Sequence, residues 1–109
     1  MKLECASFIS SKNATEQEII NAFLDDTGRG EFITLYKDDQ IYMLAFGEFD
    51  DLYILHYREG DKDNHFKCIN ELNKSEVEKA FLKYLKGDDT WKTDYQWEKM
   101  EIKPWWKFW

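Results

Sequence analysis

The chain has 109 residues, a length that fits one domain around one hydrophobic core. Hydrophobic residues make up 43% and aromatic residues 17% of the sequence, which excludes intrinsic disorder. The formal net charge of −7 disfavours nucleic acid and anionic lipid as partners and favours a basic protein.

The first elements predicted are a short strand and a helix. Residues 2–9 alternate in the way a strand does. Thr15 and Glu18 have the spacing of a capping box, in which each side chain serves the other residue's backbone N–H. Apolar residues follow at helical spacing until Gly28, so we expect the first helix at about residues 15–26.

The middle of the chain predicts a four-stranded antiparallel meander. Residues 31–46 form two arms rich in strand-forming residues, with Asp38-Asp39 between them as a two-residue turn. Further strands are predicted at residues 52–57 and 65–69, and sequential strands usually lie next to each other.

A second helix is predicted between Asn73 and Gly87. Asn73 can cap it, Glu76 follows three residues later, and Gly87 suits the left-handed C-terminal cap. Residues 95–102 then predict a last strand, which ends before Pro104.

Both faces of the predicted sheet are rich in apolar residues. If the turns centre as proposed, one face carries Phe32, Tyr36, Ile41, Met43, Ala45, Tyr53, Leu55, Tyr57, Phe66 and Cys68. The other face carries Ile33, Leu35, Tyr42, Leu44, Phe46, Leu52, Ile54 and Ile69. The two helices can cover one face, so terminal strands, the C-terminal tail or a partner must cover much of the other.

Two cysteines, Cys5 and Cys68, are too few for a disulfide scaffold, and we expect both to be reduced and buried. The N-terminus does not resemble a signal peptide, because Glu4 interrupts it and no long apolar stretch follows. These features predict a cytoplasmic protein.

The two histidines form the weak candidate metal site of the sequence. If the third hairpin turns about Gly60-Asp61, His56 and His65 lie directly opposite each other, with side chains close enough to share a metal. No third ligand has a fixed spacing, so a hydrogen-bonded histidine pair is the default interpretation, and neither a metal nor any other cofactor is predicted.

Carboxylates gather at five predicted turns, where Asp stabilises the backbone locally. Because the sequence has no phosphate-binding loop and no nucleophile elbow, we predict a protein without catalytic residues. The acidic residues that could meet a basic partner are Glu48, Asp50, Asp51, Asp61 and Asp63.

The tail, residues 104–109, is dense in aromatic residues, and its partner-binding candidates are Trp105, Trp106 and Trp109. It can pack on the second sheet face as a strand or clamp, or stay exposed as an anchor for a partner, because tryptophans often carry interface energy. An interfacial membrane anchor is a third alternative, which the acidic body disfavours.

From Glu31 onward, over residues 31–98, the sequence resembles a family of small bacterial proteins associated with polymorphic-toxin immunity. The resembling residues are Tyr57-Arg58-Glu59-Gly60, His65-Phe66, Leu72, Glu76, Ala80-Phe81, Tyr84, Gly87-Asp88-Asp89-Thr90-Trp91 and Trp97-Glu98. The resemblance implies a protein that binds and neutralises a toxin domain, and it brings no catalytic residues with it.

We therefore expect one α+β domain over residues 1–109, with a mostly antiparallel sheet of a four-stranded meander plus terminal strands and two helices on one face. Its predicted function is a non-enzymatic, acidic binding protein of the immunity type that neutralises a cognate, basic toxin domain. The alternatives are a homo-oligomeric interaction module, such as a homodimer, and a small-ligand or metal-binding domain that uses His56 and His65. Nucleic acid and membranes are not expected as partners.

Overall fold

The computed structural model of the chain describes residues 1–5, 10–25, 32–47 and 52–100. Its strands are β1 (Lys2–Cys5), β2 (Ser10–Ser11), β3 (Phe32–Asp38), β4 (Ile41–Gly47), β5 (Leu52–Glu59), β6 (His65–Cys68), β7 (Leu72–Asn73) and β8 (Trp97–Lys99). Its helices are α1 (Glu16–Asp25), α2 (Lys74–Lys86), α3 (Trp91–Asp94) and a short 3₁₀ helix, η1 (Lys62–Asn64).

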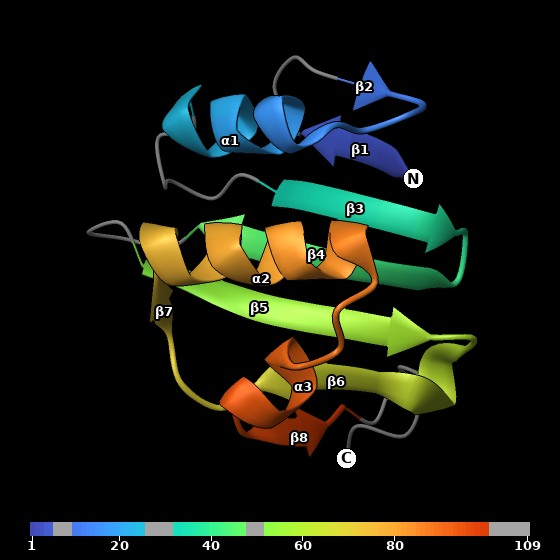
Figure 1. Cartoon of the computed structure of the whole chain (residues 1–109). Helices are drawn as coiled ribbons and strands as arrows, with labels where there is room; N and C mark the ends of the chain where they lie inside the picture. Colours follow the sequence, from blue (N-terminus) through green and yellow to red (C-terminus); the bar gives the residue numbers. More distant parts are fainter. Residues whose placement is uncertain (6–9, 26–31, 48–51, 101–109) are drawn as a thin grey trace.

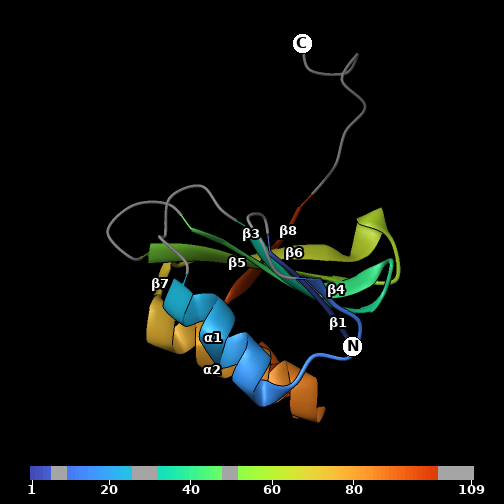
Figure 2. The same ribbon diagram turned by 90° about the horizontal axis from the view of Figure 1, so that it is seen from above.

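The strands form one sheet in the order β2-β1-β3-β4-β5-β6-β8, and β7 pairs with the first residues of β5 (Figure 1). Every described pair of strands is antiparallel, and β3 to β6 form the predicted meander. The predicted α+β class is confirmed. Both predicted helices, α1 and α2, lie on the same face of the sheet, which we call the covered face (Figure 2).

Local capping signals place these helices. At α1, the Thr15 backbone N–H donates to Glu18 Oε1 at 3.1 Å and the Glu18 N–H donates to Thr15 Oγ1 at 3.2 Å, which confirms the capping box. At α2, the Glu76 N–H donates to Asn73 Oδ1 at 2.9 Å. Gly87 ends α2 in the left-handed region with a φ of 76°, as predicted.

The hydrophobic core lies between the helices and the covered face. Phe23 of α1 makes edge-to-face contacts with Phe81 of α2 and Tyr53 of β5, at centroid separations of 5.1 and 5.9 Å. The other large side chains that are fully buried include Leu3, Ile19, Ile33, Leu35, Met43, Leu55, Val77 and Trp91. Cys68 is buried, as predicted, whereas Cys5 is only partly buried.

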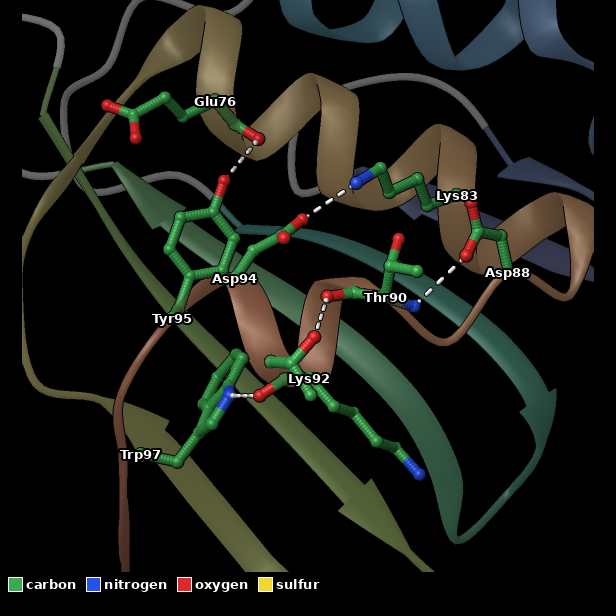
Figure 3. Close-up of polar contacts among 9 residues, drawn as sticks. Glu76, Lys83, Asp88, Thr90, Lys92, Asp94, Tyr95 and Trp97 are labelled. Carbon is green, nitrogen blue, oxygen red and sulfur yellow. Dashed lines mark hydrogen bonds and ion pairs between the residues drawn. The ribbon is translucent and has the colours of Figure 1, made fainter.

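Helix α3 was not predicted from the sequence, and it arises from the polar residues that follow α2. Asp88 Oδ1 accepts the Thr90 N–H at 3.0 Å (Figure 3). This bond turns the chain, and the next residue, Trp91, is buried in the core. Trp97 Nε1 donates to the Lys92 carbonyl at 3.0 Å and so joins β8 to α3. Of the final strand predicted at residues 95–102, β8 covers Trp97–Lys99, and residues 101–102 lie outside the described residues.

The register of β3 corrects the predicted faces. Tyr36 pairs with Tyr42 but Asp38 pairs with Ile41, so Lys37 is an extra residue in β3 and the turn falls one residue later than Asp38-Asp39. The shift moves Ile33 and Leu35 to the covered face and Phe32 and Tyr36 to the opposite one. This opposite face, the open face, carries Phe32, Thr34, Tyr36, Tyr42, Leu44, Phe46, Ile54, His56, Arg58, His65 and Lys67.

Candidate functional site

Two of the predicted partner-binding residues, Asp61 and Asp63, are described by the structure, and both are exposed. Asp61 Oδ1 accepts the Asp63 N–H at 2.9 Å and the Asn64 Nδ2–H at 3.1 Å, so it also stabilises η1. The remaining candidates, Glu48, Asp50, Asp51, Trp105, Trp106 and Trp109, lie outside the described residues.

Acidic turns that are far apart in the sequence meet at one end of the sheet. The Gly60 N–H donates to the Gln40 carbonyl at 2.8 Å, and Arg58 Nη1 donates to Gln40 Oε1 at 2.7 Å. These bonds hold the β3–β4 turn, with Asp38 and Asp39, against the turn that follows β5. The C-terminal end of α2 reaches the same end of the molecule (Figure 1). We call this region the acidic end, and its carboxylates are Asp38, Asp39, Glu59, Asp61, Asp63, Asp88 and Asp89.

The acidic end contains a pocket of about 340 Å³ between the hairpin tips and the α2–α3 junction. Its lining residues are Lys37, Ile41, Glu59, Tyr84, Asp89, Trp91 and Lys92. The volume lies at the small end of the range for ligand-binding pockets. Two carboxylates and two ammonium groups line it, and Lys92 forms an ion pair with Glu59. The pocket is therefore lined by both charged and aromatic residues, and the formal charges of its lining cancel.

The charges in the pocket are fixed by their neighbours. A hydrogen bond with Glu59 raises the pKa of Lys92, so this ammonium group stays charged. Burial, followed by the carboxylates of Glu59 and Asp89, raises the pKa of the Tyr84 phenol, so this group stays neutral. Tyr84 Oη and Trp91 Nε1 are buried and have no hydrogen-bond partner among the described residues. Such a set of charged and polar groups can bind a polar partner.

The predicted geometry of the histidine pair is wrong in one respect. His65 pairs with Arg58 and His56 pairs with Lys67, so the two histidines are diagonal neighbours and not directly opposite. The reason is η1, which lengthens the predicted hairpin turn and moves the register by two residues. A shift of two keeps both rings on the open face, and His56 Nδ1 lies 3.1 Å from His65 Nε2.

The hydrogen bonds of this pair do not suit a metal. Arg58 Nε donates to His65 Nδ1 at 3.1 Å, and because Arg is always a donor, His65 must carry its hydrogen on Nε2 and donate it to His56. A metal-binding histidine instead donates from its second nitrogen to a carboxylate or carbonyl. Among the described residues, no group of three or more His, Cys, Asp or Glu side chains could hold a metal ion.

Both histidines are held neutral at pH 7. Burial, then His65 and Lys67, lowers the pKa of His56 to about 4. Burial, then Arg58, lowers the pKa of His65. The pair is therefore a neutral hydrogen-bonded element of the open face.

The residues that carry the resemblance to immunity proteins have structural roles. Gly60, with a φ of 112°, shapes the turn after β5, and Gly87 caps α2. Trp91 and Trp97 pack edge to face at 5.8 Å, and Trp91 also contacts Tyr84 of α2 at 5.6 Å. Both tryptophans therefore pack beside the helices.

Sequence reasoning missed Glu59 and Asp89 as members of one site. In the sequence each belongs to a separate local turn, and their proximity depends on the long-range pairing of strands. The positive-φ glycines that follow or precede these residues mark the turns but carry no information about which turns are neighbours.

No protein-family model matches the chain, and neither the curated proteins nor the solved structures contain a significant match to it. Within the described residues, no helix is long and apolar enough to cross a membrane.

Proposed function

We propose that this protein is a non-enzymatic binding protein of the immunity type, which neutralises a cognate basic toxin domain in the cytoplasm by direct contact. The observation that carries the proposal is the acidic end, where turns from separate parts of the chain bring exposed carboxylates together and Glu59 and Asp89 line a pocket beside Lys37 and Lys92. The resemblance of residues 31–98 to immunity proteins supports the same function.

Electrostatics supports a basic partner. The chain has a net charge of −7, and Asp38, Asp39, Asp61 and Asp63 are all exposed at the acidic end. Clustered surface charge accelerates association with an oppositely charged partner and disfavours wrong partners. The pocket beside these residues places Glu59 and Asp89 next to Lys37 and Lys92, and such charged groups can form strong hydrogen bonds with a polar partner.

Co-expression tests this function. The toxin domain encoded beside this protein's gene is expressed alone, with the wild-type protein, or with charge-reversed variants. The double variant Asp39→Lys/Asp63→Lys should lose protection, because it reverses the charge of two side chains of the acidic end. Neither carboxylate accepts a hydrogen bond from the described residues, so the fold should be kept.

The matched control is Glu71→Lys, compared with the single variant Asp63→Lys. Both substitutions change the net charge equally, and Glu71 is exposed next to β7, away from the acidic end (Figure 1). Glu71→Lys should protect as the wild type does. Failure of the wild-type protein to protect, or equal effects of the two single variants, would contradict the proposal.

A further inference from the structure

The open face presents apolar side chains that no described helix covers (Figure 2). Phe32 is 47% exposed, and its ring contacts Phe46 at 4.9 Å. Two residues further along the strands, Leu44 lies opposite His56. Beyond them, the ring centroids of Tyr36 and Tyr42 are 5.4 Å apart. An uncovered aromatic and aliphatic surface of this kind marks a contact site.

The described chain ends at the border of this face. Strand β8 pairs with β6 at the edge of the sheet, and the Met100 N–H donates to the His65 carbonyl at 2.8 Å. His65 is itself a residue of the open face. The nine residues 101–109 therefore start beside the surface that lacks a cover.

We infer that the C-terminal tail, residues 104–109, lies across the open face and covers its aromatic side chains. Nine extended residues reach about 30 Å. Phe32 lies four strand spacings, or about 19 Å, across the sheet from β8 and four residues, or about 13 Å, along the strands from the row of His65, which is about 23 Å in a straight line. The tail is thus long enough to reach Phe32 and Phe46.

The chemistry of the tail fits this position. Trp105, Trp106, Phe108 and Trp109 supply large apolar rings for an apolar surface. Pro104 has no amide hydrogen, which disfavours extension of the sheet as a further paired strand and favours a path over its face. This inference is independent of the acidic end and of the proposed toxin-binding function.

Acrylamide quenching of the tail tryptophans in the full chain tests the inference. The fluorescence of the tail tryptophans is obtained by subtracting the emission of the variant Trp105→Phe/Trp106→Phe/Trp109→Phe from that of the wild-type protein. We expect quenching several-fold weaker than that of free tryptophan. Phe32→Ser on the open face should increase the quenching of the tail tryptophans. The control Leu24→Ser on α1, where the side chain is 69% exposed, should leave the quenching unchanged.

Other occupants of the open face give different results. Quenching equal to that of free tryptophan overturns the inference, and protection that appears only when a partner is added assigns the tail to that partner. Protection that disappears when light scattering shows dissociation of a dimer assigns the face to a second copy.

Truncation after Met100 gives a second measurement, because it leaves every described residue in place. We expect the truncated chain to bind an apolar dye such as ANS several-fold more strongly than the full chain does. Equal dye binding, with an unchanged circular dichroism spectrum, would also overturn the inference.

Discussion

The two faces of the sheet differ in what surrounds their side chains. On the covered face, Leu35, Met43 and Leu55 are completely buried beneath α1 and α2. On the open face, Leu44, Phe46 and Ile54 come from the same strands but keep part of their surface exposed. The difference teaches that apolar content alone does not make a core, since burial depends on which elements pack above each face.

The largest effect is expected from a truncation in the covered core. Phe81→Ala should lower the free energy of unfolding by about 4 kcal/mol, because Phe81 is fully buried and the cavity cannot close. In the chain truncated after Met100, where the tail cannot cover the open face, Phe46→Ala should cost about 1–2 kcal/mol, because Phe46 is only partly buried. Urea unfolding of both variants measures the difference, and equal costs would contradict the distinction between the faces.

The pH dependence of stability tests the open face next. His56 has a folded pKa of about 4 against an ordinary value of 6.5, so the unfolded chain binds this proton first as the pH falls. The contribution of neutral His56 to the free energy of unfolding should therefore be fully present above pH 6.5. It should decrease by about 2 kcal/mol as the pH falls towards 4, after allowance for the partial exposure of the ring. His65 acts in the same direction, and the cations facing the pair are Arg58 and Lys67.

The variant His56→Gln supplies the control for this pH dependence. It removes the titrating group while it keeps a side chain that can accept a hydrogen bond. Its unfolding free energy should vary less between pH 6.5 and pH 4 than that of the wild type. An identical slope would show that other groups cause the dependence.

A smaller effect is expected where α2 ends above the covered face. Gly87→Ala should cost about 1 kcal/mol, because alanine is strained at a φ of 76°. A Cβ atom at this position meets no atom within 4 Å, so the cost measures backbone strain alone. Thermal unfolding checks it, and an unchanged melting temperature would indicate that the end of α2 relaxes.

The smallest effect is expected at the surface of the helix layer. Lys86 of α2 and Glu16 of α1 form an ion pair at 2.7 Å, and both side chains are more than half exposed. Lys86→Ala should change stability by less than about 0.5 kcal/mol, since water and salt screen such pairs. A larger loss would mean that this pair helps to hold the two helices together over the covered face.

Local signals predicted much of the fold, and long-range register did not follow from them. Thr15 with Glu18 and Asn73 with Glu76 mark helix starts because each capping bond joins residues three apart. The extra residue Lys37 in β3 has no comparable signature, and it exchanged the faces of that strand.

The site was harder to predict than the fold for the same reason. Asp61 and Asp63 were expected in a binding surface, but their proximity to Asp38 and Asp39 depends on the bond between Gly60 and Gln40. Likewise, η1 determines how His56 meets His65, and Asp88 with Thr90 determines how Trp91 enters the core. These arrangements result from the pairing of distant segments, which the composition of a single turn does not reveal.

The most direct test of the proposed function is the rate of association with the purified cognate toxin at increasing salt concentrations. If the acidic end steers a basic partner, the association rate constant should fall steeply with salt, and the fall should be weaker for Asp63→Lys than for Glu71→Lys. An association rate that does not depend on salt, or the same dependence in both variants, would contradict a role for the acidic end in binding.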